Sequence, residues 1–425
     1  MLQILKTPVK ALLSTVGLKV NRVKSHSSPN IGKVGFLSHK GQKRGNVLIS
    51  YIVEPFLLKP GEEISSAHHH DWMSWQMGRT FTSFGYDVDV IDYQDYRFNP
   101  GKEYDFFVGA RTNFQRLAEL LPSSCVKIVH LDTAHWLFNN AEDYRRHLEL
   151  QRRRGVTLNS FKSVEPNWAI EYADYATINW GNQFNIGTYS YAGKPIFQIP
   201  LPTAAVYPSP EDKDYQTCRN HFLWFGSAGL VHKGLDLVLE AFSQMPEYRL
   251  TVCGPLRGRG AKAYKGPLSN EPRFEAAFHR ELYESGHIHT AGWVDVESRQ
   301  FSEIVNQCIG VIFPSCSEGC AGSVITCMQA GLIPIVSYQT NVEVGDFGYC
   351  LNECSIEEIK KNVRLVAALP PDELKKKAHR AWQFCRTHHT REKFAQNYRR
   401  AVEQIMTGQH HRPEDPVRTK SACFI

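Results

Sequence analysis

The sequence predicts an α/β protein built from two doubly wound, Rossmann-like domains that face a cleft. Its length of 425 residues exceeds what one ordinary hydrophobic core accommodates. Short apolar runs alternate with longer amphipathic patterns, which is typical of parallel sheets covered by helices. The alternation starts afresh after the proline-rich segment 199–210. Two domains in sequence, each of this type, predict a ligand site between them.

The first domain is predicted to span residues 46–203. It opens with an apolar, β-branched run that is typical of a buried parallel strand. Strands are expected at 47–53, 88–91, 105–110, 126–131, 175–178 and 196–199. Helices are expected at 72–84, 114–121, 141–154 and 164–173.

The second domain is predicted to span residues 204–371 and repeats the same alternation. Its strands are expected at 222–226, 250–255, 287–293, 309–313 and 333–336. A long amphipathic helix at 372–407 follows, and residues 408–425 are predicted to be a disordered tail.

Residues 1–45 are predicted to be a basic arm and linker. Nine of the 49 Lys and Arg residues precede the first acidic residue, Glu54, so the excess of +6 lies in this arm. Residues 1–24 have the pattern of a basic amphipathic helix, which could lie on an anionic membrane surface, pack on the protein body or be a frayed terminus. The nearly balanced remainder argues against nucleic-acid binding.

The sequence contains neither an apolar run of about 20 residues nor the long apolar centre of a signal peptide. The eleven cysteines show no C-x-x-C pair and no zinc-like spacing. We therefore expect a cytoplasmic protein without a metal site, peripheral on the inner face of the plasma membrane if the arm binds lipid.

The segment 308–338 is interpreted as strand, loop, helix and strand. Pro314 ends the first strand, and Gly319 and Gly322 allow the backbone to approach a ligand closely. The N–H groups of Gly322, Ser323 and Val324 would open the helix toward an anion, most simply a diphosphate.

This segment resembles the donor-binding segment of retaining GT-B glycosyltransferases of the family 4 type, the glycosyl transferases group 1. Their pattern is P-S-x-x-E-G-x-G, followed by a helix ending E-A-x-A-x-G-x-P. Thr326 stands at the position of the second glutamate. The matching residues are Pro314, Ser315, Glu318, Gly319, Gly331 and Pro334.

The segment 225–234 resembles the family's G-R-L-x-x-x-K-G, in which an Arg and a Lys clamp the diphosphate. Gly226 opens the loop, Lys233 and Gly234 match the second half, and Ser227 replaces the Arg with a spacing one residue longer. The resemblance therefore implies that Lys233 binds the donor diphosphate together with the loop around Gly226 and Ser227.

The resemblance also implies roles for single residues. Glu318 would contact the donor sugar or lie beside its anomeric carbon, and Thr326 would offer the ribose a single hydrogen bond. His135, after the strand at 126–131, would face the donor sugar, whereas His130 would lie in the core. Lys233, Glu318 and His135 are the predicted catalytic residues.

Three other polar groups have weaker interpretations. Among His68, His69 and His70, we expect an acceptor contact, with His68 preferred. Asp87 and Asp89 open a strand and are interpreted as structural. The arginines of the helix at 141–154 make a basic face, which either receives an anionic acceptor or is simply solvated: Arg145, Arg146, Arg152, Arg153 and Arg154.

The predicted function is transfer of a sugar, with retention of configuration, from a nucleotide-diphospho-sugar to a glycan or lipid-linked acceptor. No cofactor is expected beyond this co-substrate. The terminal helix would brace the first domain, as in relatives. Two alternatives remain: a catalytically silent nucleotide-sugar-binding protein, suggested by Ser227 and Thr326, and a GT-B sugar-nucleotide epimerase or hydrolase.

Overall fold

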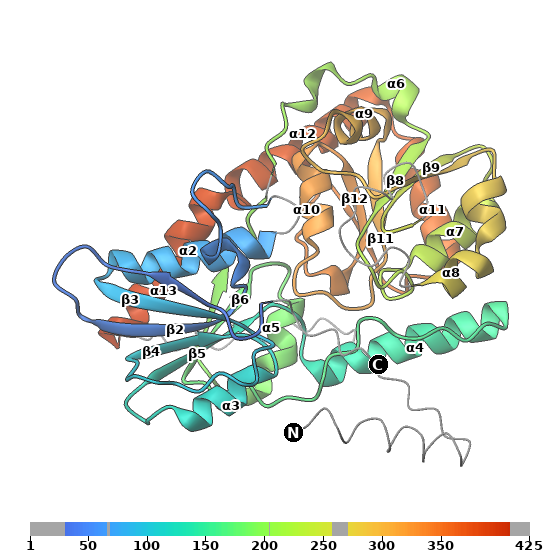
Figure 1. Cartoon of the computed structure of the whole chain (residues 1–425). Coiled ribbons are helices and arrows are strands. Elements are labelled where there is room, and N and C mark those ends of the chain that lie inside the picture. The colour runs from blue at the N-terminus through green and yellow to red at the C-terminus, as the bar shows by residue number, and fades with distance from the viewer. Residues whose placement is uncertain (1–29, 66–68, 204, 257–270, 409–425) are drawn as a thin grey trace, which may run out of the picture.

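The structure is a computed structural model and describes residues 30–65, 69–203, 205–256 and 271–408. The chain forms two α/β lobes, each built around a largely parallel sheet (Figure 1). The predicted fold class, two Rossmann-like domains in the GT-B arrangement, is confirmed.

The first lobe contains a seven-stranded sheet with the order β1-β3-β2-β4-β5-β6-β7. All neighbours are parallel except β1, which pairs antiparallel with β3 at the edge. The strands are β1 Val34–Leu37, β2 Gly45–Tyr51, β3 Tyr86–Asp92, β4 Phe106–Gly109, β5 Val126–Leu131, β6 Tyr175–Asn179 and β7 Ile196–Ile199.

The helices of this lobe cover both faces of its sheet. Val47 and Ile49 of β2 belong to one buried cluster, and Leu48 of the same strand belongs to another that includes Phe114. This alternation is what a strand buried on both faces requires. The helices are α2 His69–Ser83, α3 Asn113–Leu120, α4 Trp136–Arg154 and α5 Phe184–Tyr189, with short 3-10 turns at Glu54–Phe56 and Ser190–Ala192.

The second lobe contains a six-stranded parallel sheet with the order β10-β9-β8-β11-β12-β13. Strand order reverses between β8 and β11, and doubly wound sheets bind ligands at this switch point, at the carboxyl ends of the strands. The strands are β8 His221–Phe225, β9 Arg249–Cys253, β10 Ile288–Gly292, β11 Gly310–Phe313, β12 Ile333–Ser337 and β13 Tyr349–Leu351.

The second lobe also has short and long helices on both faces of its sheet. They are α6 Tyr215–Cys218, α7 Leu235–Ser243, α8 Pro272–Ala277, α9 Arg299–Gln307, α10 Gly322–Gln329 and α11 Ile356–Ala367, with 3-10 turns at Pro210–Asp212 and Tyr338–Thr340 and a π-helical turn at Arg280–Glu284. Within the described ranges, no helix is both long and apolar enough to cross a bilayer.

The single terminal helix predicted at 372–407 is wrong, because the chain forms two helices there. α12, Pro371–His388, packs on α10 and β12 of the second lobe, and α13, Arg391–Thr407, packs on α2 and β7 of the first. The break is fixed at His389, whose carbonyl accepts from the N–H and hydroxyl of Thr203 and whose Nδ1 lies 2.9 Å from the Leu201 carbonyl. α13 therefore lies along the first lobe, whereas α12 touches that lobe near its end, where Phe384 and His388 pack on Trp180.

Two other predictions are corrected. The segment expected to be a linker contains β1, a short edge strand whose neighbouring Gly and Lys residues resemble a loop in sequence. The helix expected at 164–173 is extended chain ending in a turn, because Pro166 lacks an N–H and restricts the residue before it. Ala169, Ile170 and Ala173 are nevertheless buried, which explains the helix-like pattern.

The helix α4 belongs to the first lobe but also contacts the second, and Figure 1 shows it extending beneath the second lobe. Near its end, the Arg153 guanidinium lies 2.5 Å from buried Asp236 and 3.2 Å from Glu240, while Arg154 lies 3.3 Å from Glu240. Arg153 and Arg154 therefore pair with acids of α7, and neither is a freely solvated side chain nor part of the cavity lining. Arg145 pairs with acids of its own helix.

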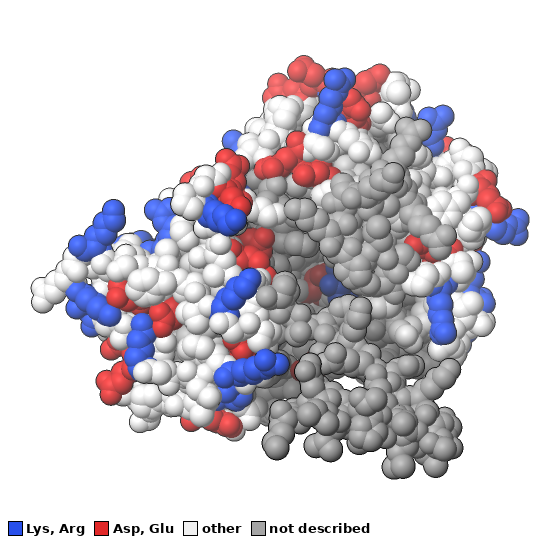
Figure 2. All heavy atoms as spheres, viewed as in Figure 1, with Lys and Arg blue, Asp and Glu red and all other residues white. Residues whose placement is uncertain are grey.

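The outer surface carries charges of both signs. In the view of Figure 2, Lys and Arg side chains are interspersed with Asp and Glu over both lobes. Residues 1–24 lie outside the described residues, so the predicted membrane contact of the arm stays a prediction. The predicted disordered tail, from residue 409 onward, also lies outside them.

Candidate functional site

A cavity of about 910 Å³ lies between the lobes, at the carboxyl ends of both sheets. Because both switch-point edges open into it, loops from the two domains meet around one space. The second lobe contributes the loops after β8, β10 and β11 and the start of α10. The side chains lining it from the first lobe include His69, His70, Tyr93, Arg111, Asp132, Asn179 and Lys162.

The loop after β11 approaches the first lobe so closely that two positions require glycine. A β-carbon on Gly319 would lie 2.1 Å from the carbonyl oxygen of Asp132, and one on Gly322 would lie 2.7 Å from Cε1 of His69. The first turn of α10, with its unsatisfied N–H groups, therefore opens into the cavity at Gly322 and Ser323.

Glu318 and Lys233 form an ion pair in the cavity wall. Lys233 Nζ lies 2.5 Å from Glu318 Oε1, which also accepts a 3.0 Å hydrogen bond from Ser315 Oγ. Burial alone would raise the pKa of Glu318, but the neighbouring charges, that of Lys233 above all, lower it to about 2. Glu318 is therefore an anion at neutral pH, and within the described part of the chain Oε2 has no hydrogen-bond partner.

The glycine loop after β8 is held by a buried carboxylate. Glu271 accepts from the N–H groups of Gly229, at 2.7 Å, and Leu230, at 3.1 Å. Burial raises the pKa of this carboxyl, although the two N–H groups oppose the shift. The loop places Gly226 and exposed Ser227 on the cavity wall.

Thr326 also lines the cavity, from the second turn of α10. Its hydroxyl donates a 2.9 Å hydrogen bond to the carbonyl of Gly322 in its own helix. The hydroxyl oxygen can therefore accept a bond from a ligand, whereas its proton already has a partner.

The first-lobe wall is built around a buried carboxylate that the sequence analysis did not select. Asp132, directly after β5, accepts bonds from Arg111 at 2.7 and 3.1 Å, and Arg111 stacks on Tyr93 at 4.4 Å. Burial opposes ionisation of Asp132, but the Arg111 charge lowers the carboxyl pKa below its ordinary value. Arg111 adopts a positive φ of 64° after β4, a conformation seldom used by such residues outside functional sites.

The structure does not bring His135 to the cavity. Its Nδ1 accepts from the N–H of Leu137 at 3.3 Å, so it caps α4, and its Nε2 lies 3.0 Å from Tyr191 Oη. His135 is not among the residues that line the cavity, and its predicted contact with the donor sugar stays a prediction. His130 lies in the core against Thr177, as expected.

Three consecutive histidines, at 68–70, are the candidates for the predicted acceptor contact, and His69 and His70 form the first residues of α2. His68 lies outside the described residues, whereas His69 and His70 line the cavity. His70 Nδ1 lies 2.5 Å from the Tyr51 hydroxyl, and His69 packs against Gly322. Asp87 pairs with Lys43 and Asp89 with Lys102, and none of the four lines the cavity, which agrees with the structural interpretation of the two acids.

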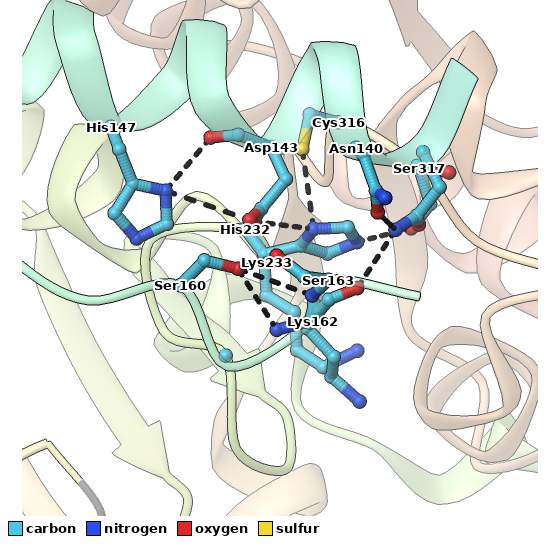
Figure 3. A network of polar contacts seen from close by, with 12 residues as sticks. Asn140, Asp143, His147, Ser160, Lys162, Ser163, His232, Lys233, Cys316 and Ser317 are labelled. Atoms are coloured by element: carbon cyan, nitrogen blue, oxygen red, sulfur yellow. Dashed lines mark hydrogen bonds and ion pairs between the residues drawn. The ribbon is translucent and has the colours of Figure 1, made fainter. Parts of the chain in front are cut away.

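A polar network joins α4 to the Glu318 loop (Figure 3). His232 Nδ1 lies 2.9 Å from Asp143 Oδ1 and 3.5 Å from Cys316 Sγ, and Nε2 donates to the carbonyl of Ser317 at 2.5 Å. In the part of the chain that the structure describes, these three side chains form the group that could hold a metal ion, because their ligand atoms lie within 4.8 Å of one another. Because His232 already bonds on both ring nitrogens, we assign the group to hydrogen bonding between the lobes.

Lys162 is the residue that sequence reasoning missed most clearly. It lies in the loop between α4 and β6 and reaches the second lobe, where its side chain packs on Gly229. The stretch around it, Asn-Ser-Phe-Lys-Ser, has no motif that would single it out. For Asp132, by contrast, the signal was present: it directly follows a strand at the ligand edge.

Comparison with known proteins agrees with this arrangement. Residues 219–368 match the family described as Glycosyl transferases group 1. Sucrose-phosphate synthase from Thermosynechococcus elongatus has a similar structure, with a TM-score of 0.57 and 14% identity over 87% of this chain and 100% of that one. Anabaena HepE in complex with UDP-glucose gives a TM-score of 0.51 and 10% identity over 86% and 99% of the two chains.

Among curated proteins, none matches the sequence. At these identities the solved structures establish the fold, and the family match covers the second lobe with both loops that surround Lys233 and Glu318. In fold, and in the sequence of its second domain, the chain is similar to the group 1 glycosyltransferases of GT-B architecture.

Proposed function

We propose that this protein transfers a sugar from a nucleotide-diphospho-sugar to an acceptor hydroxyl with retention of configuration. One observation carries the proposal: the first turn of α10, Lys233 and the Glu318 carboxylate surround one cavity between two Rossmann-like lobes. A volume of about 910 Å³ lies within the range of ~300–1,000 Å³ that is ordinary for small-molecule sites. HepE was solved with UDP-glucose, so UDP-glucose is the first donor to test.

In the proposed reaction, the bond between the anomeric carbon and the diphosphate oxygen breaks, and the electron pair stays on the diphosphate. The acceptor oxygen forms the new glycosidic bond on the same face of the sugar, and its proton passes to the departing phosphate oxygen. The growing negative charge would be stabilised by Lys233 and by the N–H groups at the start of α10.

Glu318 has two tasks in this proposal. Its Oε1 holds Lys233 and Ser315, which orients the ammonium toward the cavity. Its Oε2 would accept a hydrogen bond from a donor-sugar hydroxyl, and its negative charge would stabilise the positive charge that develops near the anomeric carbon.

Glu318→Gln tests this division of tasks. We expect turnover to fall at least tenfold, while affinity for the free nucleoside diphosphate, which lacks the sugar, stays within about threefold. Initial rates and calorimetry measure the two quantities. An equal loss of nucleotide affinity would mean that Glu318 organises only the phosphate loop.

The reaction is proposed to need no metal ion, because a lysine and helix N–H groups can neutralise the diphosphate. Turnover in excess EDTA should therefore equal turnover without it. Loss of turnover that manganese or magnesium alone restores would contradict the mechanism.

A second candidate is a nucleotide-sugar-binding protein without transferase activity. Two residues favour it: Ser227 replaces a clamping arginine, and Thr326 replaces a carboxylate that would bind the ribose diol in relatives. A thermal-shift panel of UDP-, GDP-, ADP- and TDP-sugars identifies the donor, and an acceptor screen with that donor separates the candidates. Binding without turnover on glycan and lipid-linked acceptors would favour the silent protein.

A further inference from the structure

Lys162 lies in the cavity, yet the proposed reaction so far gives it no role. It belongs to the first lobe, but its stem crosses to the second and packs on the glycine loop: a β-carbon on Gly229 would lie 2.5 Å from Lys162 Cγ. Gly229 has a φ of +90°, so the loop is shaped by a glycine where the lysine passes.

The loop that carries Lys162 is anchored at several points. Asn139 Nδ2 donates to the carbonyl of Lys162 at 2.8 Å, and the Lys162 N–H donates to Ser160 Oγ at 3.3 Å. Asn140 pairs with both backbone groups of Val164, at 2.8 Å each. These bonds fix the backbone to α4, so the side chain of Lys162 starts from a fixed point at the cavity wall.

The Lys162 ammonium lies close to a second cation. The charge of Lys233, with burial second, lowers the pKa of Lys162 to about 8. The other charged groups that act on it are Glu318, Arg111 and Glu271. Figure 3 shows the Lys162 and Lys233 side chains extending toward the same side of the polar network.

Unlike Lys233, the Lys162 ammonium has neither a hydrogen bond nor an ion pair with any described residue. Two like charges on one cavity wall oppose each other, with the single Glu318 carboxylate bonded to only one of them. An anion bound between the two lysines would remove the repulsion, so the arrangement is complementary to a ligand with more than one negative charge.

We propose that Lys162 is the second diphosphate-binding cation of this protein, so that the donor's diphosphate is held from both lobes at once. This inference rests on the proposed function. It explains Ser227: the cation absent from the glycine loop is supplied by the loop after α4.

The test uses the full chain and three matched lysine variants: Lys162→Met, Lys233→Met and, as a control, Lys361→Met on the exposed face of α11. Binding of inorganic pyrophosphate, of UDP, GDP, ADP and TDP, and of the corresponding monophosphates is measured by calorimetry. We expect Lys162→Met to weaken pyrophosphate and the preferred diphosphate at least tenfold, the monophosphate less, and Lys361→Met to match the wild type. Lys162→Arg should recover most of the loss.

A second measurement separates a direct contact from a structural role. At pH 8.5 about three quarters of free Lys162 is neutral if its pKa is about 8. The protein should therefore take up protons when it binds a diphosphate at pH 8.5. Calorimetry detects this as a binding heat that changes with the ionisation enthalpy of the buffer, and Lys162→Met should abolish the change.

The outcomes are distinguishable. The role of Lys162 is overturned if the wild type binds a diphosphate and Lys162→Met binds it with an affinity within twofold of the wild type. It is also overturned if both proteins take up the same number of protons on binding. In either case the proposed function still stands. If the wild type binds neither pyrophosphate nor any of the nucleoside diphosphates, the proposed function fails and this inference fails with it.

Discussion

Replacing Lys162 by Met should stabilise the ligand-free protein, although it removes a group that we assign to ligand binding. Met keeps the apolar stem that packs on Gly229 and removes the charge that faces Lys233. The expected result is a higher free energy of unfolding without ligand and a weaker response to pyrophosphate.

The magnitude follows from the pKa. A tenfold change in an acid constant is worth about 1.4 kcal/mol. Lowering the pKa of Lys162 from 10.5 to about 8 therefore costs the charged, folded protein at most about 3.5 kcal/mol. Because the side chain is only partly buried, solvent reduces this cost, and we expect Lys162→Met to gain about 1–2 kcal/mol at pH 7.

The pH dependence has a definite sign. Below pH 8 both folded and unfolded chains carry the charge, so the full penalty is present. Between about pH 8 and 10.5 the unfolded chain binds the proton more tightly, so the contribution of Lys162 to stability should rise with pH. Lys162→Met should lack this rise.

Urea unfolding at pH 7 and pH 9.5, read by circular dichroism, measures both effects. Lys233→Met is a control with the opposite expected effect, because it leaves the Glu318 carboxylate, whose side chain is 17% exposed, without its ion pair. Its free energy of unfolding should fall by about 2–4 kcal/mol. If Lys162→Met destabilises the protein as much as Lys233→Met does, the two lysines do not repel each other and the reasoning is refuted.

Three further predictions concern other parts of the chain. Gly319→Ala should abolish turnover and lower the free energy of unfolding by about 1–3 kcal/mol, because the new methyl group would meet the Asp132 carbonyl at 2.1 Å. Gly187→Ala is the control and should be neutral, because there is open space around Gly187. A neutral Gly319→Ala would mean that the loop relaxes freely. Arg153→Ala should cost about 2–4 kcal/mol in urea unfolding, because it removes the guanidinium that bonds buried Asp236 and leaves only the nearby charge of Arg146. Asp236→Asn in the same background should recover part of the loss, and no recovery would assign the loss to the packing of the arginine stem. A chain lacking residues 1–24 should keep turnover on a soluble acceptor but no longer sediment with anionic vesicles, and equal sedimentation of both chains would reject the lipid contact of the arm.

Local sequence signals located much of the second-lobe wall of the cavity. The loop and helix of 314–329 combine a proline that ends a strand, glycines that allow close approach and an acid near a helix start. Each of these residues shapes only the chain within a few positions of it in the sequence. Lys233 is recognisable for the same reason, since its glycine loop is contiguous in sequence. Residues whose roles depend only on neighbouring chain can be found without a structure.

The first-lobe side of the cavity depends on contacts that sequence patterns do not carry. His135 lies at the expected sheet edge, but it is four residues past Leu131 and its ring serves the helix start and Tyr191. Lys162 reaches the glycine loop 67 residues further along the chain, and only the course of α4 places it there.

The same course of α4 links the state of the cleft to the occupancy of the site. From α4 and the loop after it, Asp143 bonds His232, Arg153 bonds Asp236 and Lys162 enters the cavity. Separating the lobes would break the first two bonds and withdraw Lys162 from the proposed diphosphate site. A ligand that binds both lysines therefore binds the closed arrangement more tightly than the open one, and by linkage it must favour closure by the same free energy. In the proposed reaction, the nucleoside diphosphate that remains after sugar transfer would keep these contacts, and its release would require the lobes to separate. Lys162→Met should then speed that release in proportion to the affinity it removes.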